Sequence, residues 1–458
     1  MSDWRNCPRK RLDNRYGSVA DGAVWRKQVE LNCNSNYREL VVAKSTERSI
    51  AGTPRHTRQR CGRALGTVWL GIFVACIAAA NAPAGLGAEQ VPGLVQEEPT
   101  SGFYVKTNRG YMVPYSFTIP GTDVAIEMVP IPGGLLRMGS PPTEKGRKAN
   151  EGPQFEVEIQ PFWMAKYETR WCEYQQYMRM YRIFKEMQSR SLRPVTDENR
   201  VHAVTAPTEL YEPSFTYEKG QDPQQPAVTM TQFAAKQYTK WLSLLTGQQY
   251  RLPLECEWEH ACRAGTRSAY FFGDDPAQLG DYAWYFDNSD ETTHPVGQKK
   301  PNPWGLYDIY GNVAEWCIDQ VLEDGYQRFA GKRVTQWQAA VWPTQLYPRV
   351  LRGGHWDDTA EACRSAARME SNDPEWKSED PNLPLSPWWF TTDPARGVGF
   401  RIVRSLEELP DELISRFWEA DVEEIKQDVQ ARLDEGRGVL GLVDPQLPEV
   451  IRHMQQNP

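Results

Sequence analysis

Apolar and polar residues alternate in several short stretches, and this pattern predicts β-strands there. Over Ala125–Ser140, two β-prone runs flank Pro132-Gly133-Gly134, so the pattern indicates a strand, a turn and a second strand. Over Phe155–Ile159, two Glu residues alternate with apolar residues, which is typical of a strand with one face in water. Short β-like pieces and turns dominate residues 248–404.

A spacing of three to four residues between apolar positions predicts helices elsewhere. The clearest helix covers Met230–Leu245, with Thr229 and Gln232 in a capping-box pattern and Gly247 at its end. Its apolar face comprises Ala234, Tyr238, Trp241, Leu242 and Leu245.

Three further segments complete the expected organisation. Residues 167–187 have helical spacing, and the polar, Pro-bearing residues 188–222 are predicted to form a surface insertion. The segment Leu406–Arg432 mixes apolar residues with many charges and predicts an amphipathic helical appendage. The apolar positions of that appendage are Leu409, Leu413, Phe417 and Val422.

The N-terminal part has the pattern of a targeting segment. Residues 64–88 have no charged side chain, follow a basic stretch and end in small residues, as secretory signal peptides do. We therefore expect export to the periplasm, the cell envelope or the medium. An uncleaved membrane anchor and lipidation at Cys76 are the alternatives, and the anchor would be the chain's one route to a membrane.

Charge divides at the same point. Residues 1–88 hold 14 Lys and Arg against 6 Asp and Glu, a net charge of +8. Residues 89–458 have a net charge of −16, which gives −8 for the whole chain. An acidic body repels phosphate backbones, so we expect no nucleic-acid partner. Five cysteines follow residue 88 without a Cys-x-x-Cys pair, which argues against a four-cysteine zinc site.

Four blocks of sequence, in order, resemble the formylglycine-generating enzyme (sulfatase-modifying factor) family. The ordered set is specific, although each block alone is weak. The blocks are Val129–Ser140, Pro161–Thr169, Tyr250–Thr266, and Gly305–Trp316 together with Arg352-Gly353-Gly354 and Gly399-Phe400-Arg401.

The resemblance implies an α+β fold, C-type-lectin-like, with little regular secondary structure. The expected organisation is a poorly ordered extension (1–63), a signal peptide or anchor (64–88), a linker (89–124), the sulfatase-modifying factor domain (125–404) and a helical C-terminal appendage (405–458).

Members of this family usually hold structural calcium at the fourth block. The matching positions are Asp308, Gly311, Val313 and Glu315, where two carboxylates and two backbone carbonyls would supply hard oxygen ligands. The alternative is a turn with a buried, hydrogen-bonded carboxylate.

Enzymes of this family oxidise a sulfatase cysteine to formylglycine with copper, oxygen and a cysteine pair. Here Asp358 and Ala360 occupy the positions of that pair, and Cys363 lies too close to the following Arg-Ser-Ala-Ala-Arg strand to be either member. Since copper(I) selects soft thiolates, copper binding is not expected.

Two weaker features surround that position. His355 with Asp357 and Asp358 is a candidate acid–base or metal cluster, against a polar lining as the alternative. An aromatic insertion, Met369–Arg396, is expected to border a ligand groove, although its aromatic residues would equally cap the loop onto the core. The groove candidates are Trp356, Arg368, Trp376, Trp388 and Trp389.

The sequence therefore predicts a pseudoenzyme: a binding or scaffold module for a peptide or glycan. The alternatives are a formylglycine-generating oxidase with an atypical site and a structural component of the cell envelope.

Overall fold

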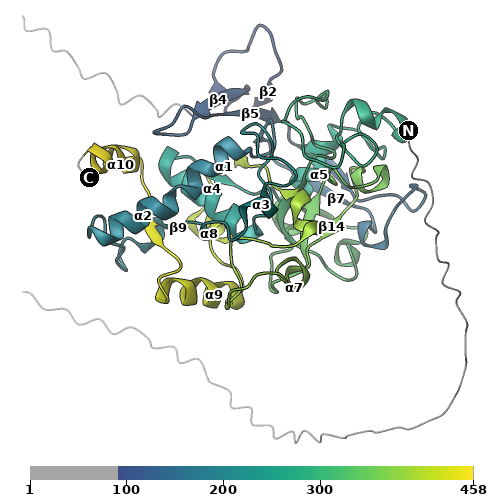
Figure 1. Cartoon of the computed structure of the whole chain (residues 1–458). Helices are drawn as coiled ribbons and strands as arrows, with labels where there is room; N and C mark the ends of the chain where they lie inside the picture. The colour runs from purple at the N-terminus through teal and green to yellow at the C-terminus, as the bar shows by residue number, and fades with distance from the viewer. Residues whose placement is uncertain (1–90, 457–458) are drawn as a thin grey trace, which may run out of the picture. The chain divides into compact units, whose positions relative to one another are not determined.

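The computed structural model describes residues 91–456, in which short strands form five small sheets among helices and long loops (Figure 1). The largest sheet has the order β10-β16-β8-β5-β4, and every pairing in it is antiparallel. Its strands are β4 (Tyr115–Thr118), β5 (Ala125–Ile131), β8 (Phe162–Ala165), β10 (Tyr250–Arg251) and β16 (Val403–Ser405). This mixture of elements is the predicted α+β fold.

The five-stranded sheet lies between two hydrophobic cores. On β8, Trp163 and Ala165 join one core, whereas Phe162 and Met164 join the other. Successive side chains of a strand point to opposite faces, so a strand with a core on both faces is apolar throughout. All four residues of β8 are accordingly buried.

A second sheet, β14-β13-β11-β15, positions the region matched by the fourth sequence block. Its central strand β11 (Ala314–Gln320) is buried at every residue and pairs antiparallel with β13 (Arg349–Arg352) and parallel with β15 (Val398–Gly399). The edge strand is β14 (Met369–Glu370). Three segments that are distant in sequence therefore meet along β11.

The predicted strands over 125–140 are confirmed as β5 and β6 (Gly134–Met138), but they do not form a hairpin. β6 instead pairs with β7 (Phe155–Ile159), which has the bounds predicted from its alternation, in the sheet β12-β7-β6. A Cβ on Gly133 would lie 2.8 Å from the Ile159 carbonyl oxygen, so the turn between the two sheets needs glycine.

The predicted long helix is α4 (Gln232–Thr246), and its start differs from the prediction. Thr231, rather than Thr229, is the N-cap and accepts a hydrogen bond from the Ala234 amide. Thr229 has a φ of +69°, outside the helical region. Gly247 is the C-cap, as predicted.

The other helices follow the sequence order. They are α1 (Trp171–Met178), α2 (Met180–Ser189), α3 (Pro213–Thr216), α5 (Glu255–Arg263), α6 (Gln336–Ala339), α7 (Asp373–Trp376), α8 (Asp411–Trp418), α9 (Glu423–Asp434) and α10 (Leu447–Gln456). The remaining strands are β1 (Leu94–Val95), β2 (Val105–Thr107), β3 (Gly110–Met112), β9 (Ala203–Thr205), β12 (Arg333–Thr335) and β17 (Leu440–Leu442).

Two segments have more structure than the sequence predicts. Residues 94–118, within the expected linker, form β1 to β4. The middle of the expected surface insertion is buried, because β9 pairs with β17. That pairing joins positions more than 230 residues apart, so local polarity does not reveal it.

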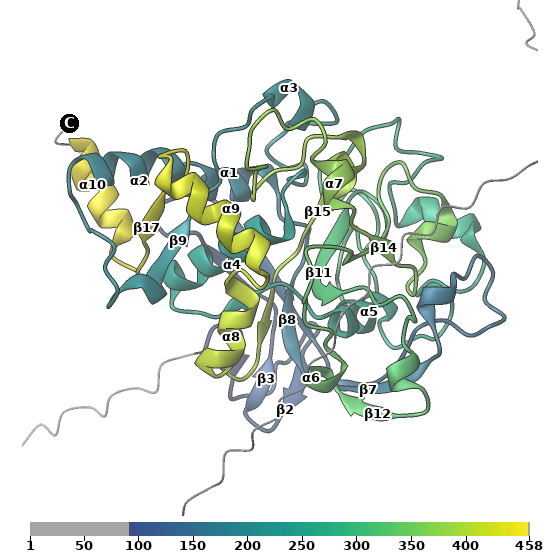
Figure 2. The same cartoon turned by 90° about the horizontal axis from the view of Figure 1, so that it is seen from below.

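The C-terminal segment is helical, as predicted, and it packs against the body of the domain. Figure 2 shows α8, α9 and α10, in yellow, along the side that carries α2 and α4. Phe417 is fully buried and Val422 is 4% exposed. The predicted extension and signal or anchor, residues 1–88, lie outside the described residues. Within residues 91–456, every helix is too short or too polar to cross a bilayer.

Candidate functional site

The loop after β13 corresponds to the position of the expected cysteine pair. It begins with Gly353 and Gly354, whose φ values of +101° and +71° favour glycine. A Cβ on Gly354 would lie 2.7 Å from the Cys363 Sγ. The chain therefore turns sharply at these glycines before His355, and the 3₁₀ helix η5 (Ala360–Cys363) follows.

Both ring nitrogens of His355 contact other residues of this turn. Its Nδ1 accepts a hydrogen bond from the Asp357 amide at 3.2 Å, and its Nε2 lies 3.4 Å from Asp358 Oδ2. The same carboxylate oxygen accepts from the His355 amide at 3.0 Å. Across residues 91–456, no three His, Cys, Asp or Glu side chains gather as a metal site would need. The predicted cluster thus forms a locally bonded turn.

Trp356 anchors the loop to its surroundings. The side chain is 7% exposed, and its Nε1 donates to the Arg396 carbonyl at 3.3 Å. The Lys219 ammonium lies 5.1 Å from its ring centroid. On the other side of the loop, the Phe286 amide donates to the Asp358 carbonyl at 3.0 Å. Segments from three parts of the chain therefore hold this turn.

The thiols of the described residues are unpaired and mostly buried. All five cysteines there are free, and Cys363 is fully buried. Burial raises the pKa of the Cys363 thiol well above its usual range and raises that of Cys262 to about 12. The thiolate is the metal-binding form of cysteine, and burial disfavours it at both positions.

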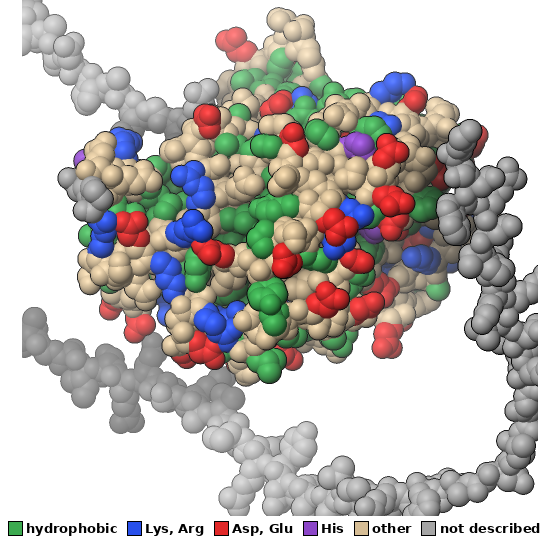
Figure 3. All heavy atoms as spheres, viewed as in Figure 1, with side chains coloured by type: hydrophobic (Ala, Val, Ile, Leu, Met, Phe, Trp, Pro, Cys, Tyr) green, Lys and Arg blue, Asp and Glu red, His purple; other side chains and the backbone are tan. Residues whose placement is uncertain are grey.

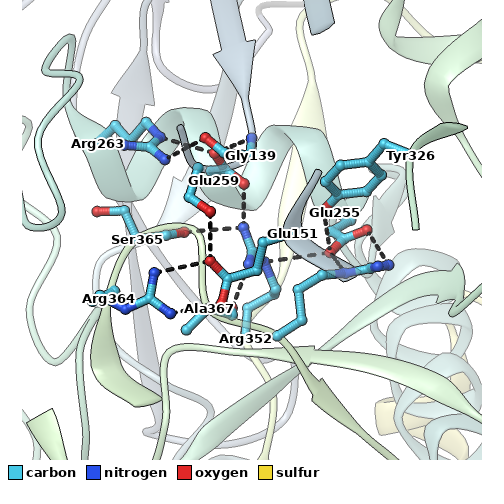
Figure 4. Close-up of polar contacts among 12 residues, drawn as sticks. Gly139, Glu151, Glu255, Glu259, Arg263, Tyr326, Arg352, Arg364, Ser365 and Ala367 are labelled. Carbon is cyan, nitrogen blue, oxygen red and sulfur yellow. Dashed lines mark hydrogen bonds and ion pairs between the residues drawn. The ribbon is translucent and has the colours of Figure 1, made fainter. Parts of the chain in front are cut away.

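A buried network of ion pairs underlies the loop (Figure 4). Glu255 and Glu259 project from α5, one helical turn apart. Glu255 accepts from Arg368 at 2.6 Å and lies 3.6 Å from Arg352, which also binds Glu259. Arg263 donates to Glu259 at 2.8 Å.

The network extends to residues 364–368, between η5 and β14, and is balanced in charge. This segment, which the sequence predicts as a strand, has no strand pairing in the structure. Arg364 binds Glu151 at 2.6 Å and also contacts Glu144. Four carboxylates thus face four guanidinium groups, and each side chain is no more than 6% exposed. Removal of one partner would leave the other charge buried and uncompensated, which is costly. The network therefore fixes residues 364–368 against α5. Arg368, a predicted groove residue, belongs to this network.

The aromatic insertion packs onto the core. Trp376, Trp388 and Trp389 are 3%, 0% and 4% exposed. The Trp388 Nε1 lies 3.4 Å from Thr205 Oγ1, and the Trp389 Nε1 donates to the Thr208 carbonyl at 2.8 Å. The five predicted groove residues therefore do not line one shared groove. The sequence left open whether these aromatic residues border a groove or pack the loop onto the core. The structure shows that they pack onto the core.

A cavity of about 440 Å³ lies beside this insertion. Its walls come from Tyr181 of α2, from residues 208–216, from residues 379–391 of the insertion and from residues 432–437 at the end of α9. Trp389 contributes to one wall. The sequence does not predict this cavity, because these four segments are distant in the chain.

Comparison with known proteins identifies the domain. A family model described as sulfatase-modifying factor enzyme 1-like domain matches residues 119–380. The chain belongs to the sulfatase-modifying factor family. This confirms the family and the fold class inferred from the four sequence blocks.

Several relatives of this family member are similar over different lengths. Formylglycine-generating enzyme of Mus musculus is 24% identical over 366 residues, 70% of this chain and 94% of that protein. Inactive C-alpha-formylglycine-generating enzyme 2 of Bos taurus is 28% identical over 292 residues, 57% of this chain and 87% of that protein.

Serine/threonine-protein kinase pkn1 of Chlamydia caviae is 37% identical over 150 residues, 32% of this chain. That match spans 22% of the kinase's length. Among solved structures, PvdO from Pseudomonas aeruginosa is 26% identical, covers 64% of this chain and 98% of its own, and has a TM-score of 0.45.

The residues predicted to bind calcium in this family member lie around the start of β11. Asp308 Oδ2 accepts from the Gly297 amide at 2.7 Å, whereas its buried Oδ1 has no partner within residues 91–456. Burial raises the pKa of Asp308 to about 6. Burial, then Asp308 and Glu315, raise the pKa of Glu168 well above its usual range.

The donor set fits calcium only in part. Both Glu315 oxygens already accept hydrogen bonds from Arg401, and one also accepts from Trp258 at 2.8 Å. Glu315 is therefore largely engaged by these hydrogen bonds. Asp308 does fit a calcium ion, because its own Oδ1 is unpaired. The carboxylates of Asp308, Glu168 and Glu315 are all buried here, and the nearby guanidinium is that of Arg401. Calcium held by Asp308 with the Gly311 and Val313 carbonyls stays a prediction.

Sequence reasoning missed the acidic members of the ion network. Glu255 and Glu259 lie within a matched block, and their spacing of four residues on an otherwise buried helix was the available signal. Their arginine partners lie up to 113 residues away, so the pairing itself required the structure.

Proposed function

We propose that this sulfatase-modifying factor domain is an exported binding or scaffold module that lacks oxidase activity. One observation carries the proposal: neither position expected for the cysteine pair holds a thiol. Asp358 and Ala360 stand there, and Asp358 accepts a hydrogen bond within its own turn. The neighbouring thiol, Cys363, is fully buried, and burial raises its pKa well above the usual range.

Two further points support this proposal. Backbone amides of the loop bond to its own side chains: the His355 amide donates to the Asp358 carboxylate and the Asp357 amide donates to the His355 ring, so both side chains are engaged within the turn. A relative of 28% identity is itself named an inactive formylglycine-generating enzyme. What the fold supplies instead is a rigid surface with a cavity, which suits recognition of a peptide or glycan.

The test is a copper(I) titration of the purified full chain, followed by an oxygen-dependent assay on a sulfatase-type Cys-x-Pro-x-Arg peptide. We expect no tight 1:1 copper binding and no conversion of the peptide cysteine. Conversion that is lost in Cys363→Ser would instead establish an oxidase with a relocated site. The variant Cys172→Ser, at a half-buried thiol outside the loop, is the matched control.

A further inference from the structure

The 440 Å³ cavity beside the insertion combines parts inside and outside the family match. Of its walls, the lining residues from Asn382 to Thr391 and from Arg432 to Arg437 follow residue 380, where the match ends. The rest of the lining lies within the match and comes from Tyr181 of α2, from residues 208–216 and from residues 379–380. A volume of this size lies within the range of about 300–1,000 Å³ typical of ligand pockets.

Hydrogen bonds between the segments hold the walls in place. The Trp389 Nε1 joins the insertion to the Thr208 carbonyl at 2.8 Å. From the C-terminal side, Arg432 donates to the Pro384 carbonyl at 2.5 Å, and Tyr181 donates to the Arg437 carbonyl at 3.2 Å. A site that is already assembled loses less entropy on binding than one that must be ordered.

The mouth of the cavity has exposed apolar side chains. Tyr211 lines it and is 66% exposed, and Phe215 lines it and is half-buried. Leu383, next to the lining residue Asn382, is 82% exposed. Figure 3 views the side that carries α3, where hydrophobic surface lies at the centre with acidic side chains beside it. Exposed apolar groups gathered in this way indicate a binding surface.

Three exposed glutamates line the mouth: Glu209, Glu212 and Glu379. Glu209 is paired with Arg182 at 2.5 Å, so the uncompensated negative charge lies on Glu212 and Glu379. Glu379 has no hydrogen-bond or ion-pair partner among the residues that the structure describes, and the only side-chain bond of Glu212 there is to Ser214. Both lining arginines have acidic partners already, since Arg432 lies 3.9 Å from Asp380 and Arg437 binds Glu435.

From these features we infer that the cavity binds a peptide segment in which a Lys or Arg side chain lies next to an aromatic or aliphatic one. The basic group meets Glu212 and Glu379, and the apolar group packs on Tyr211 and Leu383. The inference rests on the proposed binding function and names its ligand class. Within the cavity, Trp389 and Phe390 are only 4% and 2% exposed, so neither presents an open ring face to a sugar.

The experiment compares three fluorescein-labelled peptides on the purified full chain: alternating Phe and Arg, alternating Phe and Glu, and alternating Ser and Arg. We expect the Phe–Arg peptide to bind about tenfold or more tightly than either of the others. Its affinity should fall as salt is raised, because exposed charges are screened.

Charge-reversal variants then locate the site. The double variant Glu212→Lys with Glu379→Lys should weaken binding of the Phe–Arg peptide about tenfold or more. The double variant Glu97→Lys with Glu323→Lys changes the net charge equally at exposed residues outside the cavity, and it should bind as the unaltered protein does. Circular dichroism melting of both variants verifies that folding is intact.

The outcomes separate this inference from the proposed function. If both double variants bind the Phe–Arg peptide equally weakly, or if neither variant binds it more weakly than the unaltered protein, the assignment to this cavity is overturned. The protein would still be a peptide-binding module. Absence of binding by all three peptides, or displacement of the Phe–Arg peptide by maltohexaose, overturns the basic-peptide class. The copper titration judges the lack of oxidase activity independently of these results.

Discussion

At the scale of single residues, Asp308 has the least satisfied carboxylate of the β11 region. One oxygen is buried without a partner, and two other carboxylates, Glu168 and Glu315, raise the local negative charge. Burial is the main cause of the raised pKa of Asp308, and the Glu315 carboxylate adds to it. A bound cation would offset this negative charge.

Substitution of Asp308 by Ala therefore tests the calcium prediction. In calcium we expect the variant to melt at a lower temperature than the unaltered protein, with a loss of about 2.7 kcal/mol when calcium stands at a hundred times its Kd. In chelator the two proteins should melt alike. The measurement is differential scanning calorimetry in both buffers, and an equal loss in both would make Asp308 a structural residue without a metal.

Residue-scale features of the loop after β13 could be predicted from the sequence, because they depend on a short stretch. The substitution of Asp358 and Ala360 for the cysteine pair is visible there. The burial of Trp388 could not be predicted, since it depends on Thr205, 183 residues away. An aromatic insertion looks the same in sequence whether it faces solvent or the core.

At the scale of elements, the segment between α8 and α9 is fixed to the body of the domain by buried charges. Asp421 binds Lys236 of α4 at 2.9 Å and Arg349 of β13 at 2.9 Å. Burial alone would raise the pKa of Asp421, but Lys236 and Arg349 outweigh it and hold that pKa well below its usual range. The appendage is therefore a packed part of the domain.

Asp421→Ala should destabilise the protein by about 3–5 kcal/mol, because Lys236 and Arg349 are left buried and uncompensated. The control is Glu423→Ala, which removes an exposed pair with Lys426 and should cost under about 1 kcal/mol. Urea unfolding measures both. A loss in Asp421→Ala no larger than in the control would show that the ion cluster does not hold the appendage.

Element prediction succeeded where the signal was local. The alternation over Phe155–Ile159 arises from one exposed face, and β7 has those bounds. The start of α4 was predicted two residues early, because Thr229 and Thr231 are both acceptable caps and only the backbone turn at Thr229 separates them. β9 was missed because its partner strand, β17, lies near the C-terminus.

At the scale of the whole molecule, buried acids give stability a definite dependence on pH. Burial raises the pKa of Asp319 to about 7 and that of Asp308 to about 6, from ordinary values of 3.8. The folded state then binds more protons than the unfolded state between pH 3.8 and about 7. Stability consequently falls as pH rises through that window.

We expect the free energy of unfolding, measured in urea at steps from pH 4 to pH 7 in chelator, to decrease with rising pH. Asp319→Asn should make the decrease shallower, because one of the raised groups no longer titrates. The Asp319 oxygens accept from the Val341 and Glu255 amides, so the variant is also less stable overall, and the slope is the informative quantity. An unchanged slope would contradict the assignment to Asp319.

The balanced network of four glutamates and four arginines beneath the loop also constrains how this protein can change over generations. A single substitution that removes one member leaves its partner charged in a place that water does not reach, and the folded chain becomes rare. Joint replacement by apolar residues of similar volume avoids that penalty. We therefore expect these eight positions to change together, through paired or multiple substitutions.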